Sequence, residues 1–275
     1  MTAHFAHKKS LGQHFLNNAR VPERMVESGE VTAGDVVVEV GPGTGALTEV
    51  LLARGARVIA LEADSRALRT LSERFESALA EGRLTLIHGD VRTFDFSKEV
   101  PALEDGGYKV IANIPYYLSG MLFRLFLEAR VQPSLIVFLV QKEVAERIAR
   151  DAKESLLSLS VKVYGEPQYV LTVKRGNFTP QPKVDSAIIA VRHISRKNLE
   201  NIDTTTFFRV LHAGFGSKRK QLLGNLTSLL PREKLLPIFS TLGIKPDVRG
   251  EDLSLDIWLS LTRSLLLNTK GTGGS

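Results

Sequence analysis

The sequence predicts an α/β protein, with a doubly wound parallel sheet followed by a small all-helical domain. Short apolar runs alternate with helical patterns over the first two-thirds of the chain, as expected for strands buried on both faces. From about residue 196 the strand-like runs end and amphipathic helical patterns follow. With 275 residues and 43% hydrophobic composition, the chain is long enough for one large domain and a small second one.

The strands of the predicted sheet fall into two groups. The first group consists of apolar runs separated by helical patterns, which favours parallel pairing. In one of these connections, Asp64 is placed to cap the start of a helix and Gly82 to end it. The second group flanks a proline-rich loop. The expected strands are residues 35–40, 56–62, 83–90, 108–113 and 134–141 in the first group, and 167–173 and 185–192 in the second.

The C-terminal part of the chain is predicted to be helical, because four segments place apolar residues at helical spacing. We therefore expect a first domain at 1–195, a helical domain at 196–268 and a flexible tail at 269–275. The four expected helices are residues 204–215, 218–230, 232–243 and 254–266.

Composition narrows the class of protein. The chain has no cysteine, which excludes disulfides and thiolate metal sites and favours a reducing compartment. No apolar run reaches the length that spans a membrane, and the first residues lack the apolar core of a signal peptide. We therefore expect a cytoplasmic protein that binds neither a membrane nor a metal.

The net charge of +6 is unevenly distributed along the chain. Residues 196–275 hold 12 Lys and Arg against 7 Asp and Glu, and Lys8, Lys9 and Arg20 form a small basic cluster near the start. A basic surface of this kind suits a polyanion such as a nucleic acid. A solvated basic face without such a partner explains the charge equally well.

A glycine-rich loop follows the first predicted strand, in the stretch VVVEVGPGTGALTEVLL. Gly41, Gly43 and Gly45 allow a tight turn and a close approach of a ligand to the backbone, and the next helix adds free N–H groups. With Ala46, the loop fits the pattern of a dinucleotide site, and a site for S-adenosylmethionine would use such a loop as well. The glycines alone do not separate these two cofactors from a turn that binds no ligand.

Three carboxylates near the ends of predicted strands favour one of these cofactors. Glu62 ends the second strand, where it would accept hydrogen bonds from the hydroxyls of a ribose. Asp90 ends the third strand, where it would accept from the amino group of adenine. Glu39 precedes the glycine loop, where it would anchor the loop or face an ammonium. Three acids repel a pyrophosphate and attract a cation, so the set favours S-adenosylmethionine.

The stretch KVIANIPYYLSG ends the fourth predicted strand with an amide, a proline and two tyrosines. The amino group of adenine is a poor nucleophile because its lone pair is delocalised into the ring. The side-chain oxygen of Asn113 and the backbone carbonyl of Ile114 would hold its two hydrogens and free that lone pair, and Pro115 would stiffen the turn. Tyr116 offers a face on which a base stacks. The stretch therefore suits methyl transfer by positioning, without a general base, although a buried turn is the alternative.

Eight motifs spread over nearly the whole chain carry a family resemblance. They are KSLGQHFL (9–16), VEVGPGTGALT (38–48), LEAD (61–64), GDV (89–91), NIPYYLS (113–119), QKEVAERI (141–148), FTPQPKVDSAI (178–188) and FGSKRKQLLGNL (215–226). Together they resemble the ribosomal RNA adenine N6,N6-dimethyltransferases, the KsgA (RsmA) family. The resemblance implies a Rossmann-like S-adenosylmethionine-dependent methyltransferase sheet of seven strands, the last antiparallel, and a small all-α C-terminal domain.

The resemblance also implies an activity and a partner. The expected reaction is dimethylation of two adjacent adenosines near the 3′ end of small-subunit (16S) rRNA during ribosome assembly. The expected partner is the small ribosomal subunit with its rRNA, and we expect the enzyme to be a monomer.

The resemblance assigns roles to individual residues. Tyr116 and Phe178 match the two aromatics that hold the target adenine between them. Position 14 is His where many relatives have Asn, and residues 151–161 depart from a Gly-Ser-rich segment of relatives. The expected cofactor contacts are His14, Leu16, Gly41, Glu62, Asp90 and Asn113, to which the loop and its acids add Glu39 and Gly43. The expected RNA contacts are Lys8, Lys9, Lys218, Arg219 and Lys220.

Two other functions stay open on the sequence alone. A methyltransferase of large-subunit rRNA shares the glycine loop, the NIPY motif and the proline-rich loop, whereas the stretch KRKQLLGNL favours the small subunit. A non-catalytic RNA-binding factor with the same fold is the second alternative. The intact glycine loop, the three acids and NIPY argue against it.

Overall fold

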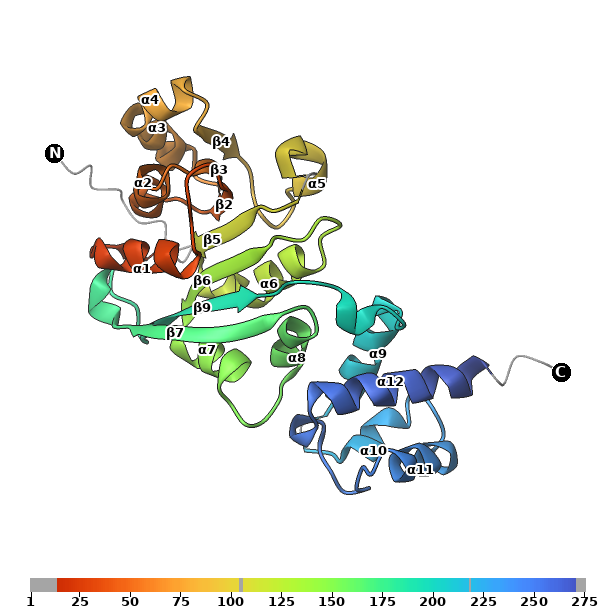
Figure 1. The fold of residues 1–275 in the computed structure, drawn as a ribbon. Helices are drawn as coiled ribbons and strands as arrows, with labels where there is room; N and C mark the ends of the chain where they lie inside the picture. The colour runs from red at the N-terminus through yellow and green to blue at the C-terminus, as the bar shows by residue number, and fades with distance from the viewer. Residues whose placement is uncertain (1–13, 104–105, 218, 271–275) are drawn as a thin grey trace. The chain divides into compact units, whose positions relative to one another are not determined.

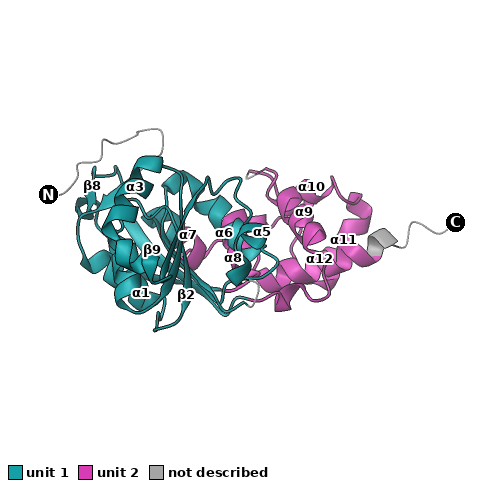
Figure 2. Ribbon diagram, turned by 90° about the horizontal axis from the view of Figure 1, so that it is seen from above, with its two compact units in different colours: residues 1–146, 166–194 teal, residues 147–165, 195–275 magenta. Residues whose placement is uncertain are grey.

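The computed structural model describes residues 14–103, 106–217 and 219–270 (Figure 1). The chain divides into two compact units, which Figure 2 colours separately. The sheet unit comprises residues 1–146 and 166–194, and the helical unit comprises residues 147–165 and 195–275. Residues 147–165, which the sequence places in the first domain, group with the helical unit instead. The backbone N–H of Glu154 donates to the carbonyl of Glu251 at 2.7 Å, and Nδ2 of Asn198 donates to the carbonyl of Val163 at 3.0 Å.

A seven-stranded sheet forms the centre of the sheet unit, in the order β4-β3-β2-β5-β6-β9-β7 (Figure 1). β9 runs antiparallel to both of its neighbours, and the other adjacent pairs are parallel. The structure therefore confirms the seven strands and the antiparallel last strand that the sequence predicts. The strands are β2 (Val36–Val40), β3 (Arg57–Glu62), β4 (Leu84–His88), β5 (Lys109–Asn113), β6 (Leu135–Gln141), β7 (Glu166–Val173) and β9 (Ser186–Arg192).

The order of the strands determines where a ligand can bind. From β2 the chain adds β3 and β4 on one side, and it then returns to add β5 and β6 on the other side. The strand order therefore reverses between β2 and β5. In open α/β sheets the crevice at the carboxyl ends of the strands, beside such a reversal, is the usual ligand site. Glu62 and Asn113 are the last residues of β3 and β5, so both lie at this edge.

The helices of the sheet unit alternate with its strands as predicted, with one break. The helix expected between Asp64 and Gly82 is interrupted at Phe75, whose φ is −116°. The Phe75 ring packs against the glycine loop, because a Cβ atom on Gly45 would lie 2.6 Å from it. We attribute the break to this long-range packing. The helices are α1 (Arg20–Ser28), α2 (Ala46–Ala53), α3 (Ser65–Arg74), α4 (Glu76–Ala80), α5 (Phe96–Glu99), α6 (Ser119–Leu127) and α7 (Lys142–Ala149), with 3-10 turns η2 (Pro101–Leu103), η3 (Tyr116–Leu118) and η4 (Arg175–Asn177).

A two-stranded ribbon that the sequence does not predict joins the start of the described chain to the proline-rich loop. β1 (Phe15–Leu16) pairs antiparallel with β8 (Phe178–Thr179). The pairing continues beyond the ribbon, since the backbone N–H of Asn17 donates to the carbonyl of Asn177 at 3.0 Å. Strands of two residues carry no periodic signal in the sequence, so this pairing is visible only in the folded chain.

The helical unit is built around Trp258, which is fully buried. Its ring stacks on Phe215, with ring centroids 5.4 Å apart, and its Nε1 donates to the carbonyl of Gly250 at 3.2 Å. In the part of the chain that the structure describes, no helix combines the length and the apolar character needed to cross a membrane. The helices are α8 (Leu156–Lys162), α9 (Thr204–Gly214), α10 (Leu222–Leu226), α11 (Arg232–Thr241) and α12 (Leu255–Lys270), with 3-10 turns η5 (Lys197–Leu199) and η6 (Gly250–Asp252).

Two predicted boundaries in the helical unit differ from the structure. The helix expected at 218–230 begins only at Leu222, so Arg219 and Lys220 lie in the turn before α10. The last helix reaches Lys270, within the tail expected at 269–275, and residues 271–275 lie outside the described residues.

Candidate active site

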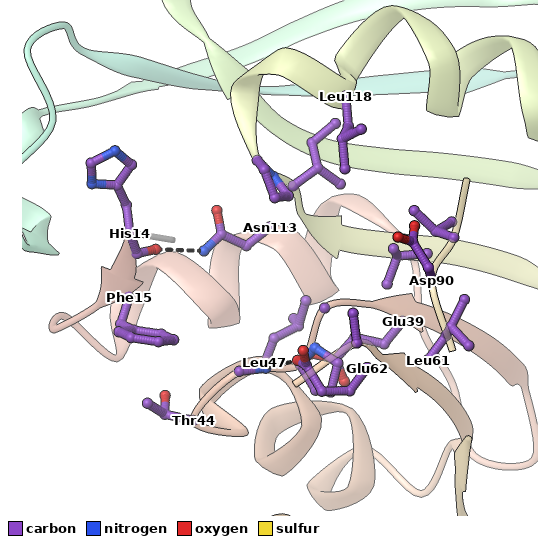
Figure 3. A pocket seen from close by; sticks show the side chains of 18 of the residues that line it. His14, Phe15, Glu39, Thr44, Leu47, Leu61, Glu62, Asp90, Asn113 and Leu118 are labelled. Atoms are coloured by element: carbon purple, nitrogen blue, oxygen red, sulfur yellow. Dashed lines mark hydrogen bonds between the residues drawn. The ribbon is translucent and has the colours of Figure 1, made fainter. Parts of the chain in front are cut away.

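An open pocket lies at the carboxyl edge of the sheet (Figure 3). It brings together residues from four strand ends and from the segment that contains β1. The predicted site residues that line it are His14, Leu16, Glu39, Gly41, Gly43, Glu62, Asp90, Asn113, Ile114, Pro115 and Tyr116.

The glycine loop presents bare backbone to this pocket. Gly41, Gly43 and Gly45 have φ values of 70°, 56° and 81°, a region that other residues rarely adopt. A Cβ atom on Gly41 would meet no atom within 4 Å, although the residue lines the pocket. A ligand can therefore approach the chain closely at this position. This is the feature that a nucleoside cofactor requires of such a loop.

Glu62 holds the glycine loop in place. Its Oε2 accepts from the backbone N–H of Gly43 at 3.1 Å, and its Oε1 accepts from the backbone N–H of Asp64 at 2.9 Å. Burial raises the pKa of the Glu62 carboxyl, and these backbone N–H groups oppose the shift. Each carboxylate oxygen has a further lone pair, so Glu62 can also accept from the two hydroxyls of a ribose.

Glu39 is buried beneath the loop, with 1% of its surface exposed. Thr48 in the first turns of α2 donates from its Oγ1 to Glu39 Oε2 at 2.7 Å. Burial raises the pKa of Glu39 to about 8, the Thr48 hydrogen bond opposes this shift, and the nearby charge of Glu62 adds to it. Glu39 therefore ties β2 to α2. The sequence leaves its partner open, and the contact with Thr48 is one that sequence reasoning missed.

Asp90 lies beside β4 and is paired with Arg92. The Nε of Arg92 lies 2.9 Å from Oδ1 and 3.0 Å from Oδ2, and its Nη2 also contacts Oδ2. The backbone N–H of Arg92 donates to Oδ1 at 2.9 Å as well. These hydrogen bonds, the side-chain bonds first, lower the pKa of Asp90 to about 2. The spacing of an acid two residues before a base was visible in the sequence and could have revealed the pair.

Asn113 is oriented by the backbone of a residue at the other end of the chain. Its Nδ2 donates to the carbonyl oxygen of His14 at 3.1 Å (Figure 3). Because the amide nitrogen is used in this contact, the side-chain oxygen Oδ1 stays available as an acceptor. Pro115 follows with φ −57° and ψ 131°, and Tyr116 opens η3. The sequence predicts an acceptor at residue 113 but does not identify the group that orients it.

Tyr116 is half-buried and is fixed by two contacts. Its hydroxyl lies 2.7 Å from the hydroxyl of Ser186, the fully buried first residue of β9. The His14 ring stacks on the Tyr116 ring, with centroids 5.6 Å apart and an interplanar angle of 26°. The Nδ1 of His14 lies 2.8 Å from the carbonyl oxygen of Pro180, so a proton on this nitrogen completes a hydrogen bond. Sequence reasoning missed the roles of both Ser186 and the His14 ring.

Three of the predicted residues that the structure describes, Phe178, Arg219 and Lys220, are not among those that line the pocket. Phe178 is 3% exposed and belongs to the hydrophobic core beneath the ribbon, and it is not among the residues that line the pocket. Its expected role as a stacking partner of the base stays a prediction. Arg219 and Lys220 are exposed in the helical unit. Lys8, Lys9 and Lys218 lie outside the described residues.

The residues present fit S-adenosylmethionine. Gly41 leaves room at the backbone, Glu62 offers a buried carboxylate for a ribose, and Asp90 offers an acceptor at the pocket edge. A cationic cofactor also suits a pocket that the carboxyl groups of Glu62 and Asp90 line together. Among the residues that the structure describes, no group of three or more His, Cys, Asp or Glu is arranged to hold a metal ion.

Comparisons with known proteins identify the family of the chain. The family model described as "Ribosomal RNA adenine dimethylase" matches residues 4–266. The "Ribosomal RNA small subunit methyltransferase A" of Dehalococcoides mccartyi (strain CBDB1) is 40% identical over 257 residues, which is 92% of this chain and 87% of that protein.

Solved structures support the fold. A dimethyladenosine transferase from Plasmodium falciparum superposes with a TM-score of 0.77 at 27% identity, covering 94% of this chain and 98% of that one. The 23S rRNA methyltransferase ErmE superposes with a TM-score of 0.70 at 23% identity, covering 91% and 99% of the two chains. The second likeness concerns the fold alone.

Proposed function

The chain belongs to the ribosomal RNA adenine dimethylase family, whose members are S-adenosylmethionine-dependent methyltransferases, and from this premise we propose its substrate and residue roles. The proposed reaction is N6,N6-dimethylation of two adjacent adenosines near the 3′ end of small-subunit rRNA during ribosome assembly. The relative that is 40% identical carries small-subunit rRNA in its name, and the likeness extends over 92% of this chain. The resemblance to the large-subunit enzyme is lower, at 23% identity.

The orientation of the Asn113 amide is the observation that carries the mechanism. With Nδ2 bound to the His14 carbonyl, Oδ1 stays available as the acceptor for a substrate. Together with the carbonyl of Ile114, it would hold the two hydrogens of the adenine amino group. Such contacts draw the nitrogen toward pyramidal geometry and make its lone pair available. The preorganised acceptors need no reorganisation during the reaction, which is why positioning alone can drive it.

The other residues of the pocket hold the two substrates. S-adenosylmethionine supplies an electrophilic methyl group on a sulfonium. Glu62 would bind its ribose, Asp90 its adenine, and the backbone at Gly41 and Gly43 its remaining polar groups. Tyr116 would stack the extruded adenine, held in its orientation by the Ser186 hydroxyl. Leu16 and His14 would complete the wall formed by the ribbon.

We further propose that Arg219 and Lys220, with Lys218, Lys8 and Lys9, bind phosphates of the rRNA. Both described members of this set are exposed. Replacing residues 218–220 with alanine should weaken binding to the small subunit and leave cofactor affinity intact, because phosphate contacts are distinct from the pocket. Equal losses of both affinities would contradict this assignment. We propose that the enzyme is cytoplasmic. We also propose that it is a monomer, and sedimentation of the purified protein would test this oligomeric state.

The decisive experiment compares rRNA from cells with and without the gene by mass spectrometry. The proposal expects loss of dimethyladenosine at two neighbouring positions near the 3′ end of the small-subunit rRNA. In parallel, the purified protein and labelled S-adenosylmethionine are incubated with small subunits and with deproteinised large-subunit RNA. Label only in the large-subunit RNA would support the alternative methyltransferase. Label in neither substrate would support a non-catalytic RNA-binding factor.

A further inference from the structure

Tyr117 is the most exposed aromatic residue described at the pocket. Its exposed fraction is 61%, whereas Tyr116 beside it is half-buried. Both belong to the 3-10 turn η3, where successive side chains point about 120° apart. The turn therefore directs one ring into the pocket wall, where Ser186 holds it, and the next ring away from that wall. Tyr117 still counts among the residues that line the pocket, so its ring lies at the mouth.

Arg92 provides a positive charge at the same mouth. Its side chain is 61% exposed and it lines the pocket with Tyr117. Both oxygens of Asp90 hold the guanidinium, which reduces the freedom of a side chain that would otherwise be flexible. The pKa of Arg92 is raised mainly by Asp90, with a small contribution from Tyr117, so the two side chains are near one another.

The charges inside the pocket restrict what can approach this mouth. The carboxyl groups of Glu62 and Asp90 line the interior and disfavour a phosphate there. A nucleic-acid strand that delivers a base to the pocket must nevertheless keep its backbone outside. Arg92 at the rim neutralises the charge of Asp90. The N–H groups of its guanidinium that Asp90 does not use can donate to a phosphate. An exposed ring beside it offers a stacking surface to any base.

We propose that Tyr117 and Arg92 form a binding subsite for the RNA nucleotide that flanks the target adenosine, Tyr117 stacking on its base and Arg92 binding its phosphate. This inference rests on the proposed function, since it requires that an adenosine of an RNA strand enters the pocket. Extruding a base leaves its neighbour without a stacking partner on one side. A ring at the pocket mouth restores that partner, and the RNA strand then enters in one orientation.

Steady-state kinetics with small ribosomal subunits at saturating S-adenosylmethionine test the subsite. Tyr117→Ala should raise KM for the subunit about 5- to 100-fold, the range that follows from losing one base–aromatic stack. Tyr117→Phe keeps the ring and should restore KM to within about twofold of the wild type. Calorimetric titration with S-adenosylmethionine should give dissociation constants within about twofold for all three proteins, since stacking on RNA does not involve the cofactor.

The salt dependence of KM tests the arginine. Arg92→Gln should reduce the slope of log KM against log salt by about 0.7 to 1, as for the loss of one phosphate contact. Arg124→Gln is the matched control, because Arg124 makes the same kind of exposed ion pair, through Nε to both oxygens of Glu128, away from the pocket lining. It should leave the slope unchanged.

The possible failures are distinguishable. If the wild type methylates small subunits and Tyr117→Ala leaves KM unchanged, the subsite is overturned and the proposed function stands. If Tyr117→Ala or Arg92→Gln weakens S-adenosylmethionine binding by as large a factor as it raises KM for the subunit, that residue acts on cofactor binding. The inference is then wrong as well. If the wild type transfers no methyl group to small subunits, the proposed function fails first. Unchanged thermal unfolding of each variant excludes misfolding as the cause of a raised KM.

Discussion

The two halves of the pocket are held together in different ways. In the proposed cofactor half, formed by Glu39, the glycine loop, Glu62 and Asp90, the hydrogen bonds join residues that lie within 30 positions of each other. In the base half, formed by residues 113–116 with His14 and Ser186, the contacts span 70, 99 and 166 positions. The first half is thus fixed by local chain geometry, and the second by the tertiary fold.

We expect this difference between the two halves to separate effects on cofactor affinity from effects on turnover. The cofactor half is buried and acidic, and its hydrogen bonds remain as long as β2, β3 and α2 stay folded. The base half depends on the ribbon of β1 and β8, which brings the His14 carbonyl to Asn113. We therefore expect substitutions in the base half to lower turnover with little effect on cofactor affinity. Substitutions in the cofactor half should change cofactor affinity or stability first.

The largest expected effect is that of Asn113→Ala. Removing a preorganised group that stabilises the transition state lowers turnover by about 10²- to 10³-fold. The dissociation constant of S-adenosylmethionine should rise by less than about fivefold, because Asn113 is only one of many lining residues. Single-turnover methyl transfer and calorimetry measure the two effects.

Asn198→Ala is the matched control for that substitution. Asn198 also donates from Nδ2 to a backbone carbonyl, that of Val163 at 3.0 Å, but it lies in the helical unit. It should alter stability and not turnover. A loss of cofactor affinity in Asn113→Ala as large as the loss of turnover would remove the distinction between the two halves.

The next effect concerns pH and the burial of Glu39. Burial raises the pKa of Glu39 from 4.5 to about 8, so the folded protein binds a proton that the unfolded chain releases above pH 4.5. The free energy of unfolding therefore falls as pH rises from about 5 to about 8, by up to about 1.4 kcal/mol per unit. Urea unfolding at pH 6 and pH 8 should show a loss on the order of 2 kcal/mol from this group.

Glu39→Gln should remove most of that pH dependence, because glutamine cannot ionise. Glu49→Gln is the control, since Glu49 lies on the same helix, α2, with 61% of its side chain exposed. It should leave the pH dependence as in the wild type. The assignment would be contradicted if the free energy of unfolding changed between pH 6 and pH 8 by the same amount in the wild type, in Glu39→Gln and in Glu49→Gln.

A pair of glycines offers a smaller and sharper test of the cofactor half. Gly41 and Gly34 have φ values of 70° and 87°, each donates its N–H to a backbone carbonyl at 2.9 Å, and neither has an atom within 4 Å of a Cβ position. Alanine should therefore destabilise the protein by about 1–2 kcal/mol at either position. Only Gly41→Ala should weaken S-adenosylmethionine binding, by roughly tenfold or about 1.4 kcal/mol.

Calorimetry on the two glycine variants decides the outcome. Equal affinities in Gly41→Ala and Gly34→Ala would mean that the cofactor does not approach the backbone at the glycine loop.

The smallest expected effect tests how Tyr116 is held. Ser186→Ala leaves the Tyr116 hydroxyl without its partner at 2.7 Å, and a lost hydrogen bond of this kind is worth about 0.5–1.5 kcal/mol. Turnover should fall roughly two- to tenfold. In Tyr116→Phe/Ser186→Ala both polar partners are absent, so turnover should be no lower than in Ser186→Ala. A twofold or greater further loss in the double variant would show that the hydroxyl acts on the substrate directly.

The positions of the strand-end residues at the pocket were predictable from the sequence. Glu62 and Asn113 end strands that the sequence identifies within two residues of their true bounds, and parallel strands bring their carboxyl ends to one edge. Asp90 comes two residues after β4, a parallel strand of the same sheet, so its place at this edge was predictable as well. The contacts between side chains were less predictable, because a strand assignment does not say which groups meet. Thr48 and Arg92 lie close in sequence to their partners and could have been found, whereas Ser186 could not.

Tertiary packing also changed what the local pattern indicates. Phe75 breaks a helix that the sequence predicts as continuous, where its ring packs against the glycine loop. Phe178 is buried in the hydrophobic core, which the motif alone does not indicate, and its role toward a base stays a prediction. Residues 147–165 are close in sequence to the sheet but group with the helical unit.

The sequence by itself determined the sheet, its glycine loop and the strand-end acids, because periodicity and backbone preference act over a few residues. The folded chain alone decided which atom of Asn113 is bound to the backbone and which stays available as an acceptor. That choice depends on a carbonyl 99 positions away, brought into contact by two strands too short to leave a pattern. Long-range pairing of this kind is stabilised by the whole fold, and no local stretch of the sequence encodes it.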